Sequence, residues 1–150
     1  MKAVIQRVSS ASVSILGNKI SSIDQGLLIL IGIHKDDEQA DIEYLVKKIA
    51  GLRIFSDSNG LMNLALNDVQ GEILVVSQFT LYAVTRKGNR PSYIQAAKPE
   101  QAIPIYETFL VQLKELQPES KVVSGIFGAD MQINLTNNGP VTIIIDSRNP

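Results

Sequence analysis

The chain contains no cysteine and no tryptophan, and His34 is its only histidine. Without cysteine there can be no disulfide, no thiolate nucleophile and no zinc site with sulfur ligands. One histidine is too few for a site built from several imidazole ligands, and no Gly-x-Ser-x-Gly motif accompanies it to suggest a serine triad. The sequence therefore predicts a protein that uses neither a metal nor another cofactor.

Long hydrophobic runs are also missing. The most apolar segment, residues 26–33, falls far short of the roughly 20 residues that a membrane helix needs. Near the amino terminus, Lys2 and Arg7 enclose only four residues, which is too short for the apolar centre of a signal peptide. We therefore expect a cytoplasmic protein that does not bind membranes.

Neither positive nor negative charge is in large excess, since 14 Lys and Arg residues nearly balance 15 Asp and Glu residues. This balance disfavours a general DNA or RNA binder, which neutralises many phosphates with basic side chains. It still allows a grip on a short single-stranded end. Basic residues do gather in one segment, at Arg86, Lys87 and Arg90. From charge alone, that segment is typical of a solvated surface turn.

The chain has 150 residues, of which 45% are hydrophobic and only 5% aromatic, so it can form one domain over 1–150 with an aliphatic core. Apolar spacing predicts a helix that begins at Asp36–Asp37 and ends at Gly51, and a second helix over 99–116 that Pro104 should kink. Alternating or continuous apolar runs predict strands over 2–8, 12–16, 19–23, 26–33, 53–56, 72–82, 121–126, 130–136 and 141–146. This pattern indicates an α+β fold with largely antiparallel sheets.

Polar residues follow the apolar run of the strand predicted over 72–82. Strand alternation places Ser77 and Phe79 on one face, and Gln78 and Thr80 on the other. Gln78 and Thr80 thus offer an amide and a hydroxyl at one strand end, which suits a small polar site. An ordinary sheet edge explains them as well, because threonine favours strands.

A second unusual segment is Asn137-Asn138-Gly139-Pro140-Val141-Thr142, between two predicted strands. Proline lacks a backbone N–H and belongs at the start of a strand, so the local chemistry favours a hairpin turn. Only about 5–6% of X-Pro bonds in folded proteins are cis, so a trans bond before Pro140 is expected from the residues alone.

Taken together, the segments 77–81 and 138–142 resemble the two signature motifs of the D-aminoacyl-tRNA deacylase family. The opening residues 1–8 and the segment 125–131 are similar to the corresponding parts of that family. The resemblance implies a barrel-like α+β fold and a homodimer with two active sites at the subunit interface. It also implies that Gly139 and Pro140 of one subunit, joined by a cis bond, enter the pocket of the other.

The resemblance further implies hydrolysis of the ester in D-aminoacyl-tRNA, a proofreading activity that releases D-amino acid and tRNA. The Gly139 and Pro140 carbonyls would accept from the substrate ammonium, and their backbone would leave no room for an L side chain. Glycine, which has no side chain, would escape this rejection. Arg7 would hold the Gly-Pro segment with its forked donors, while Phe127 and Met131 would line the pocket; a surface charge and plain core packing are the respective alternatives.

Two mechanisms remain open at this point. Thr80 could act as a nucleophile, although the sequence supplies no evident base for it. Alternatively, the backbone N–H groups of Phe79 and Thr80 would stabilise the oxyanion, the substrate 2′-OH would assist water, and Ser77 and Gln78 would orient the ester. Arg86, Lys87 and Arg90 would then contact phosphates at the 3′ end of the tRNA. The alternative from another class is a non-catalytic module of the same fold that binds RNA ends or proteins.

Overall fold

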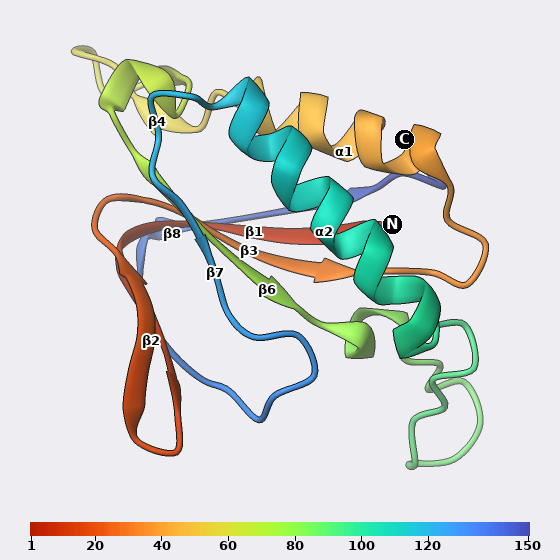
Figure 1. Ribbon diagram of the computed structural model, residues 1–150. Helices are drawn as coiled ribbons and strands as arrows, with labels where there is room; N and C mark the ends of the chain where they lie inside the picture. Colours follow the sequence, from red (N-terminus) through yellow and green to blue (C-terminus); the bar gives the residue numbers. More distant parts are fainter.

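The computed structural model describes residues 1–150 as a six-stranded mixed sheet with two helices packed on one face (Figure 1). The helices are α1 (Gln39–Ala50) and α2 (Pro99–Leu116), and short 3-10 turns form η1 (Asn67–Val69) and η2 (Phe79–Tyr82). The sheet contains β1 (Lys2–Ile15), β2 (Asn18–Ile23), β3 (Gly26–Gly32), β6 (Glu72–Ser77), β7 (Val122–Ser124) and β8 (Gln132–Asp146). A separate ladder joins β4 (Phe55–Ser56) to β5 (Met62–Leu64). No helix combines the length and the apolar character needed to cross a membrane.

The long strand β1 organises the sheet. It pairs antiparallel with β3 along its first half, with β2 along its second half, and with β8 along its other edge. This arrangement curls the sheet towards a barrel and confirms the predicted α+β fold. The pairs β3–β6 and β6–β7 are parallel, however, which the sequence did not indicate. Parallel neighbours need crossover connections, and α1 and α2 lie in the two connections concerned.

The main core lies between the helices and one face of the sheet. The predicted apolar face of α1 is buried there, and so is the corresponding face of α2. Both faces of β3 are buried, as its continuous apolar run predicted, because a smaller cluster fills the curl of the sheet on the other side. The helical core residues are Ile42, Leu45, Val46, Ile49, Ala102, Tyr106, Phe109 and Leu113.

The first hairpin differs from the prediction at its turn. β1 continues without interruption from Lys2 to Ile15, and Ile15 pairs with Asn18. The two turn residues are therefore Leu16 and Gly17, not Gly17 and Asn18. Both have positive φ, 50° and 79°, as a two-residue turn matched to the strand twist requires. The predicted strands over 12–16 and 19–23 had placed the turn at residues 17–18, so the predicted register was wrong by one residue.

The start of α1 also differs, because Asp37, where the helix was predicted to begin, has other partners. The buried Asp37 accepts from the Met1 ammonium at 2.7 Å, from the His34 backbone N–H at 2.6 Å and from Arg148 Nε at 3.2 Å. The helix begins two residues later, where Glu38 and Asp41 form a reciprocal capping box. Its end at Gly51 is as predicted.

α2 spans the predicted residues 99–116 as one continuous helix that includes Pro104. Two further boundaries were predicted differently. β6 ends at Ser77, where the prediction extended it to residue 82, and η2 follows. The two strands predicted over 130–136 and 141–146 are one strand, β8, which runs through the Gly-Pro segment.

Candidate active site

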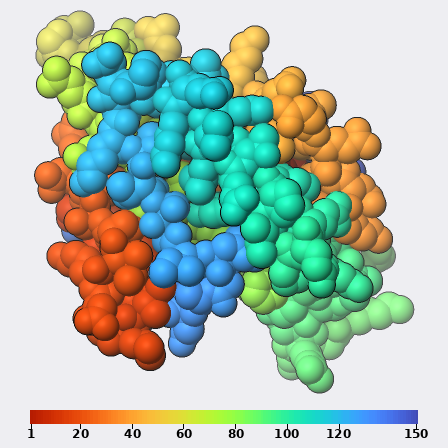
Figure 2. All heavy atoms as spheres, in the orientation of Figure 1, coloured from red at the N-terminus to blue at the C-terminus, as the bar shows by residue number.

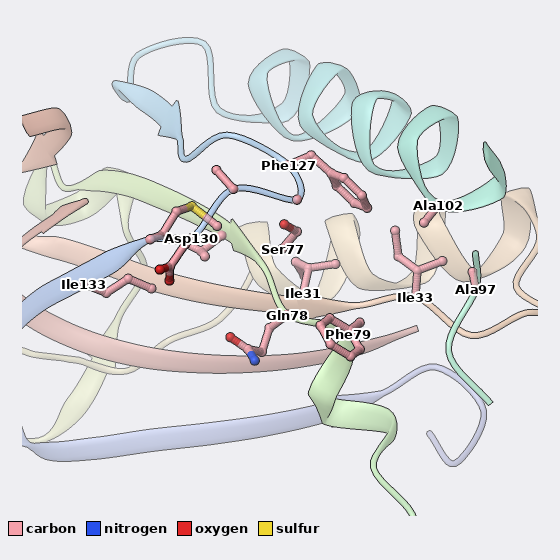
Figure 3. Close-up of a pocket in the computed structure, with 14 residues that line it drawn as sticks. Ile31, Ile33, Ser77, Gln78, Phe79, Ala97, Ala102, Phe127, Asp130 and Ile133 are labelled. Atoms are coloured by element: carbon pink, nitrogen blue, oxygen red, sulfur yellow. The ribbon is translucent and has the colours of Figure 1, made fainter. Parts of the chain in front are cut away.

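A cavity of about 280 Å³ opens where the ends of β3 and β6 meet the loop after β7 and the first turns of α2 (Figure 3). Ten of its 14 lining residues are hydrophobic, so it suits an organic group better than a hydrated ion. The lining residues are Ile31, Ile33, Val76, Ser77, Gln78, Phe79, Ala97, Ala102, Phe127, Gly128, Ala129, Asp130, Met131 and Ile133.

The end of β6 supplies the polar wall of this cavity. Ser77, Gln78 and Phe79 all line it, because the strand alternation that would separate them stops at Ser77. The Gln78 backbone N–H still bonds Ile31 of the neighbouring strand at 2.7 Å, and Phe79 begins the 3-10 turn. The first N–H groups of a helical turn have no intrahelical acceptor. Those of Phe79 and Thr80 have no acceptor in the structure.

Thr80 does not line the cavity. Its half-buried hydroxyl accepts a hydrogen bond from the Gln78 side-chain amide. An amide cannot remove a proton, so this partner does not activate Thr80. The single histidine serves elsewhere, since His34 Nδ1 accepts from the Asp36 backbone N–H at 3.1 Å.

The loop after β7 forms the opposite wall. Phe127 and Met131 line the cavity as expected, and the Phe127 ring packs on Tyr106 of α2 with ring centres 5.6 Å apart. The Tyr106 hydroxyl donates to the Val75 carbonyl at 3.2 Å. Burial raises the pKa of Tyr106 above its ordinary value, which a hydrogen bond with Ser124 opposes only in part. Tyr106 therefore stays neutral and holds Phe127 in place.

Gly139 and Pro140 do not form a hairpin turn. β8 pairs with β1 on both sides of them, with Val8 opposite Asn137 and Gln6 opposite Thr142. Residues 138–141 therefore bulge out of a continuous strand, and we call them the Gly-Pro bulge. The bond between Gly139 and Pro140 is cis, which overturns the trans expectation from local chemistry and agrees with the family resemblance.

Two side chains brace the Gly-Pro bulge. Asn137 accepts from the Val141 backbone N–H at 2.7 Å and donates to the Thr142 hydroxyl at 3.2 Å. Arg7 donates from Nε to the Asn138 carbonyl at 2.9 Å and from Nη1 to the Ile54 carbonyl at 2.6 Å. The forked guanidinium thus ties the bulge to the segment before β4, as expected for Arg7.

Only glycine fits at position 139. Its φ is +140°, and a Cβ placed there would lie 2.7 Å from the Val141 side chain and 3.0 Å from Arg7. Gly139 and Pro140 are both exposed, and neither lines the cavity. The two motifs identified in the sequence are therefore separate within one chain.

The basic segment lies in the connection between η2 and α2, where Val84 and Ser92 form an isolated bridge. We call residues 86–90 the basic loop; its side chains are exposed, and it protrudes from the molecule as the pale green projection in Figure 2. It does not line the cavity. The same connection reaches the cavity rim through Tyr93, whose ring meets that of Phe79 edge to face at 5.0 Å.

Comparison with known proteins decides the family. The family model described as D-Tyr-tRNA(Tyr) deacylase matches residues 4–146. The chain belongs to the D-Tyr-tRNA(Tyr) deacylase family. A relative from Flavobacterium psychrophilum, named D-aminoacyl-tRNA deacylase, is 60% identical over 99% of both chains. This assignment confirms the resemblance drawn from the segments 77–81 and 138–142.

Two solved structures share the fold of this deacylase family member. One, titled c-Myc DNA Unwinding Element Binding Protein, is 45% identical with a TM-score of 0.91, and the match covers 97% of this chain and 98% of that one. The other, titled as a probable eukaryotic D-amino acid tRNA deacylase, is 16% identical with a TM-score of 0.82 and coverage of 96% and 97%. At that identity the second structure supports the fold alone.

The sequence did not single out several residues of the cavity or its surroundings. Asn137 was noticed only as part of a turn, and its bracing role depends on the bulge that β1 imposes. Asp130 also lines the cavity and had been noted only as part of the segment 125–131. Ala97 and Ala102 come from the start of α2 and the residues before it, and their small side chains leave the cavity open. Nothing in their local sequence indicates that position.

Proposed function

We propose that this protein hydrolyses the ester bond of D-aminoacyl-tRNA, with the whole chain acting as one catalytic domain. Water adds across the bond between the acyl carbon and the ribose oxygen, which releases a D-amino acid and leaves a free hydroxyl on the tRNA. The observation that carries this proposal is the 60% identity, over nearly the full length, to a relative named for this activity. Its proposed substrate is a cytoplasmic RNA, so we propose the same location for the enzyme.

The cavity supports ester chemistry through its unpaired backbone donors. An ester carbonyl placed at the end of β6 would meet the N–H of Phe79, with that of Thr80 next in the same 3-10 turn; neither group has another acceptor. Donors fixed in this way stabilise the negative charge that develops on the carbonyl oxygen when water attacks. Ser77 and Gln78, in the same wall, orient the ester and the ribose.

Water, assisted by the neighbouring ribose 2′-OH, is the nucleophile that we favour. Thr80 lies outside the cavity lining, and its hydroxyl has an amide as its hydrogen-bond partner where a nucleophile would need a base. The substrate hydroxyl supplies the polar group that the chain lacks, and only RNA carries it.

Chiral selection requires a second copy of the chain. Gly139 and Pro140 are exposed and lie away from the cavity of their own subunit, so their carbonyls can face a substrate only in the partner's cavity. A row of apolar side chains supports a homodimer: Ile144, Val4, Leu30 and Val76 are consecutive cross-strand neighbours from β8 to the cavity wall. They lie on the face that the helices do not cover, and Ile144 is 71% exposed.

In such a dimer, the Gly-Pro bulge selects by exclusion. Its carbonyls accept from the substrate ammonium and its backbone occupies the space that an L side chain would need, whereas a D side chain points into open space. Backbone atoms make this selection, so D-amino acids of different sizes are accepted. Glycine has no side chain to exclude, and we propose that glycyl-tRNA is also cleared.

The basic loop is the proposed contact for the tRNA backbone. Arg86, Lys87 and Arg90 are exposed at the tip of the connection that reaches the cavity rim through Tyr93. Three cations suit a footprint limited to the phosphates nearest the 3′ end. This small footprint agrees with the net charge of −1 for the whole chain.

The activity is tested with D-tyrosyl-tRNA and L-tyrosyl-tRNA, each incubated with the purified protein while the remaining ester is measured. We expect rapid loss of the D ester and persistence of the L ester. Equal loss of both would contradict chiral selection. Loss of neither would favour the non-catalytic RNA-end or protein-binding module. Sedimentation of the same protein should give a dimer, and full activity in a monomer would refute the shared site.

The mechanism is tested by two separate changes. Replacing the terminal 2′-OH with hydrogen should reduce turnover by at least about a hundredfold, the scale of a positioned proton-transfer group. Thr80→Ala should retain substantial turnover, because the oxyanion donors are backbone groups. Loss of all turnover in a folded Thr80→Ala protein, together with normal cleavage of the 2′-deoxy substrate, would instead identify Thr80 as the nucleophile.

A further inference from the structure

Asp130 is the only ionisable side chain among the 14 residues that line the cavity. It lies beside Met131, and in Figure 3 Asp130 and Ala97 stand near opposite ends of the lining residues. The residue is exposed, and its carboxylate has neither a hydrogen-bond donor nor a cationic partner in the structure. Every other charged side chain of the protein lies outside the lining.

An unpartnered carboxylate is electrostatically unfavourable in a cavity that receives an RNA end. The phosphates of the incoming strand are negative, so a like charge at the entrance weakens binding unless it meets a cation of the substrate. The unpaired 3′ nucleotides carry no cation. The aminoacyl group does, because its α-ammonium is positively charged at neutral pH.

We propose that the Asp130 carboxylate binds the α-ammonium of the aminoacyl ester, so that the enzyme selects for a positive charge at the α-carbon. This proposal rests on the proposed deacylase function. The Gly-Pro carbonyls are neutral acceptors, so they distinguish the ammonium from a hydroxyl less strongly than an anion would. A carboxylate distinguishes the two by charge. Asp130 would thus exclude acyl groups that lack an amine, which is a criterion separate from chirality.

The test compares two esters of the same shape, D-phenylalanyl-tRNA and D-phenyllactyl-tRNA, in which a hydroxyl replaces the ammonium. The quantity measured is the ratio of their kcat/KM values. We expect Asp130→Asn to reduce this ratio about fivefold, the scale of a solvent-exposed ion pair. The loss should fall on KM for the phenylalanyl ester. Asp130→Glu keeps the charge and should keep most of the preference.

A matched control is Asp24→Asn, which removes an exposed carboxylate just before the start of β3, at the end opposite the cavity. It should leave the ratio unchanged. An equal change of both esters in Asp130→Asn would mean that Asp130 acts on the RNA or on the shape of the cavity, and would overturn the proposal. So would an unchanged ratio. Either result leaves cleavage of D-phenylalanyl-tRNA by the unmodified protein intact, so the two proposals can fail separately.

Discussion

Replacing Arg7 with lysine should weaken the rejection of L-aminoacyl-tRNA while leaving the D activity largely in place. Arg7 reaches two carbonyls at once, that of Asn138 at the Gly-Pro bulge and that of Ile54 before β4. Lysine retains the positive charge but offers a single nitrogen on a flexible stem, so it cannot bridge both carbonyls. The bulge would then lose its fixed distance from the body of the protein.

The size of the effect follows from the bond that is lost. A hydrogen bond to a charged group contributes about 1.5–3 kcal/mol, and the half-buried position of Arg7 favours the lower end of that range. If about 1.4 kcal/mol of this hydrogen-bond energy keeps the bulge in place against an L side chain, the preference for the D ester over the L ester falls about tenfold. The D ester meets the bulge only through its ammonium, so its turnover should change by less than about threefold, under 0.7 kcal/mol.

The assay measures kcat/KM for D-tyrosyl-tRNA and L-tyrosyl-tRNA with each variant. Arg53→Lys is the matched control, because the Arg53 guanidinium also donates two hydrogen bonds, to the backbone carbonyl and the side chain of Asn63, but does not contact the bulge. It should leave the ratio of the two esters unchanged. A folded Arg7→Lys protein with undiminished discrimination would refute the role assigned to the fork. Loss of both activities in parallel would also refute it, because that outcome assigns Arg7 to catalysis or to dimer assembly.

Two further predictions concern stability. Gly26→Ala places a Cβ 1.9 Å from the Glu72 carbonyl oxygen, which would force β3 and β6 apart, so urea unfolding should show a loss of at least about 3 kcal/mol. The pKa of Asp41 lies below its ordinary value. Burial alone would raise this pKa, but hydrogen bonds from Ser147 and the Glu38 backbone, together with nearby positive charges, lower it by more. Its contribution to stability is therefore present above about pH 4 and lost as the pH falls further, through the pKa of the folded state. Asp41→Asn should be less stable than the unmodified protein at pH 6 and should lose less stability between pH 6 and pH 3; an equal loss in both proteins would contradict this.

The sequence was sufficient to predict the buried face and the span of an element wherever the spacing of its own apolar residues determines them. The apolar positions of α1 and the span of α2 follow from helical periodicity, and the burial of β3 on both faces follows from its unbroken apolar run. Phe127 and Met131 were placed at the cavity by the family resemblance. Their local sequence suits an ordinary core equally well, so it could not have placed them there.

The errors arose where a distant partner decided the outcome. Asp37, where α1 was predicted to begin, instead binds the Met1 ammonium, 36 residues away. Asn137 to Pro140 have the composition of a turn, and only the pairing of both flanks with β1 makes them a bulge. Alternation failed beyond Ser77 because β6 ends there, and no residue type marks that point.

Because the Gly-Pro bulge lies within a paired strand, its length is tied to the hydrophobic core. Deleting one of its residues would shift the rest of β8 by one position against β1, and a shift of one residue turns every side chain to the opposite face. Ile143 and Ile145 would leave the core, and Thr142 and Ile144 would turn towards it. Insertions and deletions are therefore poorly tolerated at this place, and the Gly-Pro bulge can vary by substitution at positions other than Gly139 but not by a change of length.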